Sequence, residues 1–109
     1  MEFNELFEMA KEAFGKADTS DISGKLAFQF DLTGDNGGTF YLEIKDGFVN
    51  VEPHEYNDWD VKFTLSTANF EKMLVRKLNS ALAYTTGKLK IEGEIGKALE
   101  LKKLLGSDE

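Results

Sequence analysis

Hydrophobic residues recur along the chain with two spacings, and each spacing predicts a different kind of element. Near the N-terminus the apolar positions lie three or four residues apart, as they do on one face of a helix. These positions are Phe3, Leu6, Phe7, Ala10 and Phe14. The pattern predicts a first helix, and Gly15 favours its end at that point.

Four later runs alternate apolar and polar residues, which is the spacing of strands with one buried face. They cover residues 25–33, 39–45, 48–52 and 60–66. The glycine-rich sequence GDNGG separates the first two runs, and the Asp46-Gly47 pair is a strong signal for a two-residue hairpin between the next two. Pro53 ends the third run, because proline has no N–H group to donate to a strand ladder.

After the fourth run the spacing becomes helical again. Ser66 or Thr67 is expected to cap one helix, and Asn79 or Ser80 a second, shorter one. A fifth alternating run follows and changes into a last helical pattern at Gly93. Its apolar residues are Leu89 and Ile91 in the strand, then Ile95, Ala98 and Leu99 in the helix.

The inward positions of the predicted strands are apolar, and the positions between them are polar or charged. The inward residues are Phe28, Phe30, Phe40, Leu42, Ile44, Val49, Val51, Val61, Phe63, Leu89 and Ile91. One face of the sheet is therefore expected to be apolar and the other wet, and helices must cover the apolar face. The sequence thus predicts an α+β two-layer fold, with a mainly antiparallel five-stranded sheet and helices covering one face.

Length and composition favour a single domain over residues 1–109. The chain is 41% hydrophobic, which suffices to bury a core without disulfides or metals, and it contains no cysteine. It has no run of about 18 apolar residues and does not begin like a secretory leader. We therefore expect a cytoplasmic protein without stable membrane insertion.

The charge is acidic and unevenly distributed. A net charge of −7 argues against a nucleic-acid partner, which is bound mainly through lysine and arginine. Residues 1–60 hold 14 acidic and 4 basic residues, whereas residues 61–109 hold 6 acidic and 9 basic residues. The C-terminal part either faces an anionic group or is a solvated surface of mixed sign.

The stretch GKLKIEGEIGKALEL, residues 87–101, resembles a nucleotide-binding loop only at first sight. A phosphate loop needs glycine at position 82 and a hydroxyl residue after the lysine, but both places hold leucine. The dinucleotide motif fails as well, because Ile91 stands where its first glycine belongs. Because both motifs are absent, the sequence gives no reason to expect a nucleotide cofactor.

His54 is the sole histidine, and it lies between Glu52 and Glu55 in a predicted surface turn. A histidine beside a carboxylate is able to act as a general base, but a solvated loop histidine explains the pattern better. There is no second histidine and no cysteine for a metal site. We expect no catalytic residues, no metal and no enzymatic activity.

Most of the chain, from about residue 26 to 105, resembles the sterol-carrier-protein type 2 (SCP2) family. The resemblance rests on the hairpin YLEIKDGFVNVEP and on the segment from DVKFTLSTANFEKML to the last helix. Its most specific part is the run from Gly87 to Ile91 with Gly93 and Gly96. The resemblance implies a non-enzymatic domain without a cofactor, which holds a sterol, fatty acid, acyl-CoA or similar lipid in an apolar tunnel between sheet and helices.

The resemblance also implies which residues contact the lipid. The expected apolar contacts are Phe28, Phe30, Phe40, Leu42, Phe63, Phe70, Leu74, Leu82, Leu89, Ile91, Ile95, Ala98 and Leu99. A charged head group needs a positive or amide partner at the mouth, and Gln29, Arg76 and Lys97 are the candidates. From the residues alone, the inward phenylalanines fit a filled core equally well.

Several positions depart from the family pattern. Many members have glycine at the place of Arg76 and proline at the place of Ser80, so either the break between the middle helices differs or the helix continues. Lys97 and Glu100 stand where apolar residues are common, and Trp59 stands where a small residue is usual. Trp59 is expected to fill a gap or to lie at an interface.

An alternative is an interaction or dimerisation module of the same fold without bound lipid. Aromatic residues outside the inward register would provide the surface for a partner or for a homodimer. These residues are Tyr41, Phe48, Tyr56 and Trp59.

Overall fold

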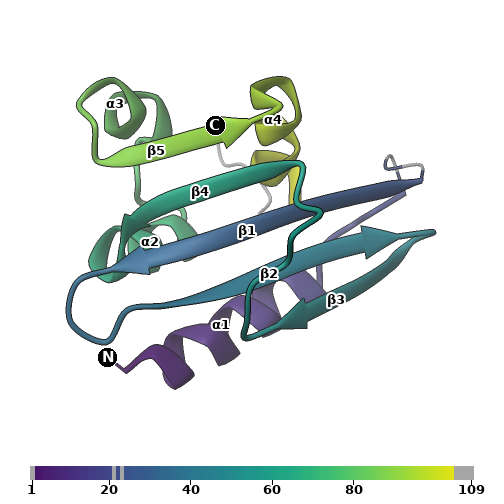
Figure 1. Ribbon diagram of the computed structural model, residues 1–109, viewed down its shortest axis with the longest axis horizontal. Coiled ribbons are helices and arrows are strands. Elements are labelled where there is room, and N and C mark those ends of the chain that lie inside the picture. Colours follow the sequence, from purple (N-terminus) through teal and green to yellow (C-terminus); the bar gives the residue numbers. More distant parts are fainter. Residues whose placement is uncertain (1, 21, 23, 105–109) are drawn as a thin grey trace.

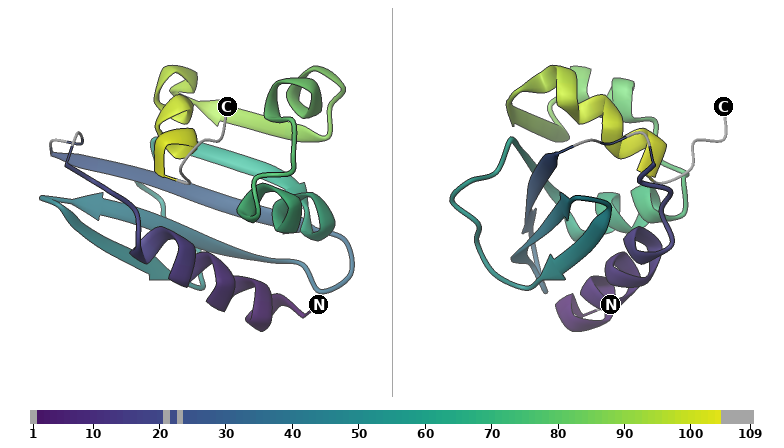
Figure 2. Two further views of the ribbon diagram at one scale, coloured as in Figure 1. Left: turned by 180° about the vertical axis from the view of Figure 1, so that it is seen from behind. Right: turned by 90° about the vertical axis from the view of Figure 1, so that its right-hand side faces the viewer.

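The computed structural model describes residues 2–20, 22 and 24–104, which form a sheet with helices on one side. The elements in chain order are α1 (Phe3–Gly15), β1 (Lys25–Thr33), β2 (Gly38–Lys45), β3 (Phe48–Glu52), β4 (Val61–Ser66), α2 (Thr67–Leu74), α3 (Ser80–Thr85), β5 (Leu89–Gly93) and α4 (Ile95–Leu104). The predicted α+β architecture with five strands is confirmed. The helices lie behind the sheet in the view of Figure 1, and the side view of Figure 2 shows them on one face.

The sheet is mixed rather than purely antiparallel, and its strand order is β3-β2-β1-β4-β5. Three neighbouring pairs are antiparallel, but β1 and β4 are parallel, with Phe30 opposite Phe63. The sequence prediction counted hairpin connections and did not foresee this pair. The pair is parallel because β4 does not form a hairpin with β3, the strand before it in the chain. Instead residues 53–60 cross the sheet and bring β4 to the free side of β1 (Figure 1).

The sequence predicted that the outer face of the sheet would be exposed to water throughout. This prediction is wrong for the part of the face that the crossing segment covers. Residues 53–60 pass over the face opposite the helices (Figure 2). Beneath them Ala27, Gln29 and Tyr41 are buried. Tyr56 stacks on Tyr41 with ring centroids 4.6 Å apart, and its hydroxyl donates to Glu43 over 2.8 Å. A polar and aromatic layer thus covers part of this face.

The inner face carries a filled aromatic core. Phe30 is fully buried and stacks on Phe40 at 4.8 Å and on Phe63 at 5.2 Å between ring centroids. Phe14 from α1 and Phe70 from α2 pack against the same ring. The alternation seen in the sequence therefore produces a continuous core under α1 and α2.

The break between α2 and α3 is clear, so the expected alternative of a continuing helix is wrong. Ser66 accepts a hydrogen bond from the N–H of Asn69 at the start of α2, and Asn79 accepts one from Leu82 at the start of α3. At the end of α2 the chain reverses through Arg76, whose φ is +58°. Two of the predicted cap residues are thereby confirmed.

A pair of backbone hydrogen bonds closes α2. The N–H of Lys77 donates to the carbonyl of Lys72 over 2.7 Å, and the N–H of Arg76 donates to Met73 over 3.0 Å. This is the Schellman arrangement, which requires a left-handed residue at the first position after the cap. Glycine adopts that conformation without steric cost, so this position explains the glycine expected in the family at the place of Arg76.

Candidate apolar binding pocket

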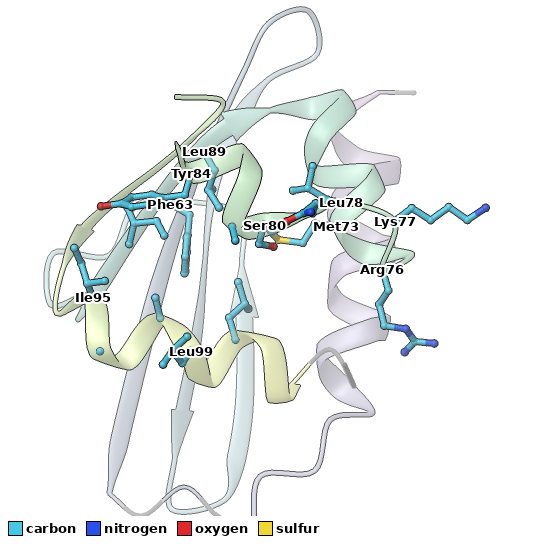
Figure 3. Close-up of a pocket in the computed structure, with 16 residues that line it drawn as sticks. Phe63, Met73, Arg76, Lys77, Leu78, Ser80, Tyr84, Leu89, Ile95 and Leu99 are labelled. Atoms are coloured by element: carbon cyan, nitrogen blue, oxygen red, sulfur yellow. The ribbon is translucent and has the colours of Figure 1, made fainter. Parts of the chain in front are cut away.

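A cavity of about 760 Å³ lies between α3, α4 and the edge of the sheet formed by β4 and β5 (Figure 3). Its walls are mostly hydrophobic. The lining residues are Phe63, Met73, Arg76, Lys77, Leu78, Asn79, Ser80, Ala81, Tyr84, Leu89, Ile91, Ile95, Gly96, Ala98, Leu99 and Leu101. Ligand sites of small molecules typically have volumes of roughly 300–1,000 Å³ and mostly apolar walls.

The floor of the pocket comes from the two strands at this edge of the sheet. Phe63 of β4 lies opposite Ile91 of β5 in the ladder, and Leu89 lies opposite Leu65. Because side chains alternate along a strand, Leu89 and Ile91 face the same side as the phenylalanine core. The pocket is therefore an extension of the core that helices cover only in part.

One wall of the pocket is α4, which leaves the sheet through a sharp turn. Gly93 has a φ of +98°, and the N–H of Glu94 donates to the carbonyl of Asp60 over 2.9 Å. The helix presents Ile95, which is 50% exposed, and Leu99, which is 68% exposed. Apolar side chains this exposed beside a cavity indicate an open pocket with a hydrophobic entrance.

The opposite wall is the segment from the end of α2 through α3. It contributes Met73 and Leu78 together with Tyr84, which is half exposed. Arg76 and Lys77 also border the pocket, but their side chains point away from its apolar interior (Figure 3). The interior is thus apolar, and the cationic groups lie at its margin.

The structure brings together seven of the residues predicted to contact a lipid. These are Phe63, Arg76, Leu89, Ile91, Ile95, Ala98 and Leu99. It places the others outside this pocket. Phe28, Phe30, Phe40, Leu42 and Phe70 are fully buried in the filled core. Leu74 packs partly against that core, and Leu82 is exposed on α3.

Two of the three predicted head-group contacts are engaged elsewhere. The side-chain oxygen of Gln29 accepts a hydrogen bond from the N–H of Tyr56 over 2.9 Å, and its NH₂ group donates to Asp31 over 3.0 Å. Gln29 is buried beneath the crossing segment, because it points away from the inward phenylalanines of β1. It therefore lies on the opposite face of the sheet from the pocket.

Lys97 is held by carboxylates at the start of α4. Its Nζ lies 3.4 Å from Asp60 and 3.5 Å from Glu94. The Asp60 carboxylate raises the pKa of Lys97 above its usual value, against a smaller opposing effect of desolvation. Asp60 in turn accepts a hydrogen bond from the N–H of Ala27 over 2.9 Å. Lys97 thus fastens α4 to the sheet instead of lining the pocket.

Nine lining residues were not among the predicted contacts, and most belong to residues 73–84. They are Met73, Lys77, Leu78, Asn79, Ser80, Ala81, Tyr84, Gly96 and Leu101. The polar cap residues of this segment suggest an ordinary helix break, and its apolar residues suggest core. No local signal in the sequence separates these residues from core, because the cavity forms only where α3 and α4 lie beside the sheet edge.

The aromatic residues of the alternative interaction surface are mostly engaged within the fold. Tyr41 is buried against Tyr56, and Trp59 lies against Gly93. Of the two roles expected for Trp59, the structure agrees with the first: the side chain fills space at the end of the edge strand β5. Phe48 is 79% exposed on β3.

No cluster of three metal-binding side chains is present among the described residues. His54 is exposed, with its Nδ1 atom 3.2 Å from the carbonyl oxygen of Glu55 and its ring edge-on to Tyr41.

In residues 2–104, apart from 21 and 23, no helix is both long and apolar enough to cross a bilayer.

Comparison with known proteins agrees with this geometry. The SCP-2 sterol transfer family matches residues 3–106. Hydroxysteroid dehydrogenase-like protein 2 of Bos taurus is 35% identical over 102 residues, which cover 93% of this chain but 24% of that protein. The Xenopus tropicalis protein of the same name is 38% identical over 80 residues, or 72% of this chain and 19% of its own length. The chain thus spans about a quarter or less of these relatives.

Solved structures with the same fold include the palmitated SCP2L2 of Aedes aegypti. That structure has a TM-score of 0.71 at 18% identity and covers 100% of this chain and 98% of its own. The sec-alkylsulfatase Pisa1 of Pseudomonas sp. contains a similar unit, with a TM-score of 0.71 at 22% identity over 86% of this chain and 15% of the sulfatase. The family match and the shared fold together lead to one conclusion: the chain belongs to the SCP-2 sterol transfer family.

Proposed function

We propose that this protein is a non-enzymatic lipid carrier that binds one acyl chain or sterol in the pocket between α3 and α4. The observation that carries the proposal is the open cavity of about 760 Å³, whose floor and walls are formed by Phe63, Leu89, Ile91 and Leu99. Such a lining suits an aliphatic ligand and offers no constellation for chemistry. The ligand would enter beside Ile95 and Leu99, where the apolar walls are already exposed.

The similarity to known proteins supports a lipid ligand. The family is named for sterol transfer, and the Aedes aegypti protein of the same fold was solved in a palmitated form. The energetics are also adequate. Each buried CH₂ group contributes about 0.8 kcal/mol, so roughly ten buried groups would supply the free energy of a micromolar complex before the cost of association.

A displacement assay tests the proposal. Fluorescently labelled palmitic acid should bind saturably, and unlabelled palmitic acid or cholesterol should compete for the site. Leu99→Lys should abolish binding, because it places an ammonium group on an apolar wall of the pocket. Phe48→Lys is the matched control, because Phe48 is at least as exposed but lies on β3.

Two results would overturn the proposal. One is equal binding by wild type and Leu99→Lys, which would place the probe outside the pocket. The other is a homodimer without any co-purifying lipid in native mass spectrometry, together with no saturable binding; that result would favour the interaction module.

A further inference from the structure

The strand β5 lies at one edge of the sheet and has a strand neighbour, β4, on one side only (Figure 1). Lys90 and Glu92 of this strand are exposed. A hollow runs between α3 and the strand, and Tyr84 and Ile91 are among the residues that line it. The free backbone groups of an edge strand are a template on which a strand of another chain is able to pair.

The hydrogen bonds of β5 show which of its backbone groups are directed at the free edge. The N–H of Glu94 donates to the carbonyl of Asp60 over 2.9 Å, on the β4 side. In an antiparallel ladder every second residue exchanges hydrogen bonds with the neighbouring strand, so Glu92 and Lys90 direct their groups to the same side as Glu94. Ile91 lies between them and therefore directs its N–H and carbonyl groups away from β4.

The charges of this segment have opposite signs on the two sides of Ile91. The residues one and three places before it are lysines, and those one and three places after it are glutamates. Two identical strands that pair antiparallel are related by a twofold axis. An axis at Ile91 places Lys90 of each copy opposite Glu92 of the other copy. Opposite charges in facing positions stabilise a strand pair, and like charges destabilise it.

The other antiparallel registers centred within β5 bring like charges together. An axis at Lys90 or at Glu92 would place that residue opposite its own copy. An axis one place further out would place two lysines opposite each other on one side, or two glutamates on the other. The axis at Ile91 also allows the outward N–H and carbonyl groups of this residue to bond to the same groups of the second copy. The charges and the backbone thus select the same register.

Exposed apolar side chains flank β5 at both ends. Leu82 and Tyr84 of α3, before the strand, are 58% and 48% exposed, and Ile95 of α4, after it, is 50% exposed. Antiparallel pairing places the start of one strand beside the end of the other, so α3 of each copy comes next to α4 of the other copy. Pairing would therefore also remove apolar surface from water on the helical side of the sheet.

We propose that β5 pairs with β5 of a second copy of this chain about a twofold axis at Ile91. The two five-stranded sheets join into one continuous sheet. Ile91 exchanges two backbone hydrogen bonds with its counterpart, and Lys90 and Glu92 form two ion pairs on the outer face, because they alternate with the inward Leu89 and Ile91. The inference goes beyond the carrier function and does not require a bound lipid.

Sedimentation equilibrium of delipidated protein tests this inference. Wild type should dimerise reversibly. Lys90→Glu should raise the dissociation constant of the dimer by at least about tenfold, because it turns both ion pairs into glutamate pairs. Glu92→Lys should do the same by creating lysine pairs. The matched control is Lys45→Glu, which makes the same charge change at an exposed position on β2 and should leave the dissociation constant unchanged.

Charge exchange provides the stricter test. Lys90→Glu/Glu92→Lys keeps opposite charges in facing positions and should restore the dimer. An equimolar mixture of the two single variants should form a mixed dimer, because each variant offers the charge that the other lacks. Circular dichroism verifies that both single variants are folded. Mixing would not repair a loss of dimer that came from misfolding.

The amide of Ile91 reports on the interface directly. Its exchange with deuterium, followed by NMR, should become slower as the concentration of wild type rises and should stay fast in Lys90→Glu. Wild type that is monomeric at all concentrations would overturn the proposal. Equal dissociation constants of wild type, Lys90→Glu and Lys45→Glu would also overturn it, by placing the dimer on another surface.

A separate measurement keeps dimerisation apart from lipid binding. Lys90 does not line the pocket between α3 and α4, so Lys90→Glu should bind fluorescently labelled palmitic acid as wild type does at concentrations where both are monomeric. Failure of the dimer with intact lipid binding would overturn this inference and leave the carrier function standing.

Discussion

Gly93 lies so close to the backbone carbonyl of Asp60 that a β-carbon at position 93 would overlap with the carbonyl oxygen. The same β-carbon would approach Cζ3 of Trp59 to 2.8 Å. Because the φ of Gly93 is +98°, both the backbone conformation and the space exclude a side chain. This contact fixes the turn from β5 into α4 and thereby positions one wall of the pocket.

Gly93→Ala should lower the free energy of unfolding by about 2–4 kcal/mol, since strain at positive φ and overlap with rigid backbone add together. Urea unfolding measures the loss. Gly47→Ala separates the two causes, because Gly47 has a φ of +86° but no neighbouring atom within 4 Å of a β-carbon. It should cost only about 1–2 kcal/mol. Equal losses in the two variants would show that the contact with Asp60 is unimportant.

Arg76→Gly should be more stable than Arg76→Ala by about 0.5–1 kcal/mol. Both variants lose the arginine side chain, so the comparison isolates the left-handed backbone conformation that closes α2. There glycine avoids a cost of roughly 1–2 kcal/mol but loses more entropy on folding, by about 0.5–1 kcal/mol. The midpoint of urea unfolding should be higher for the glycine variant, without a change in slope. Equal midpoints would show that the left-handed conformation carries no cost.

Ligand occupancy should raise the melting temperature of lipid-free protein. Palmitic acid at a hundred times its dissociation constant adds about 2.7 kcal/mol to the stability, which corresponds to roughly 10–20 °C for a domain of this size. Differential scanning fluorimetry with delipidated protein measures the shift. Leu99→Lys should abolish it and Phe48→Lys should retain it. An unchanged melting temperature in wild type would contradict occupancy of the pocket.

Lys97→Met should leave the affinity for labelled palmitic acid unchanged, since Lys97 lies outside the pocket and pairs with Asp60. The stability loss should be small, because the pair is partly solvated. The pKa of Lys97 is raised in the folded state, so the contribution of the pair is complete below the ordinary lysine pKa of 10.5 and is lost as the pH rises through the folded value. Stability curves of wild type and Lys97→Met should therefore converge above pH 10.5. A constant difference across this range would contradict the assignment.

Local chemistry made much of the fold predictable from the sequence. The alternation in residues 25–33 gave β1 its bounds, and the Asp46-Gly47 turn joins β2 to β3 with both residues at positive φ. The caps Ser66 and Asn79 are local hydrogen bonds within three residues. Each of these signals depends on neighbours in the chain, which the sequence displays directly.

The parallel β1–β4 pair and the place of the pocket depend on contacts between distant residues. Nothing near residues 53–60 indicates that they cross the outer face and bury Gln29, because the partner of that side chain is Tyr56, 27 residues away. In the same way, Phe30 and Phe63 share one apolar pattern in the sequence. Both are core residues, and only the position of their strands leaves Phe30 away from the cavity and places Phe63 at its floor.

All residues that line the pocket follow residue 61 in the sequence, whereas α1, β1, β2 and β3 pack on one another without it. The two halves should therefore differ in local unfolding. We expect amide hydrogens of α3 and α4 to exchange with deuterium much faster than those of β1 and β2, and a bound ligand to slow exchange in the helices alone. Transient opening of α3 and α4 then provides a route for lipid to leave while α1, β1, β2 and β3 stay folded.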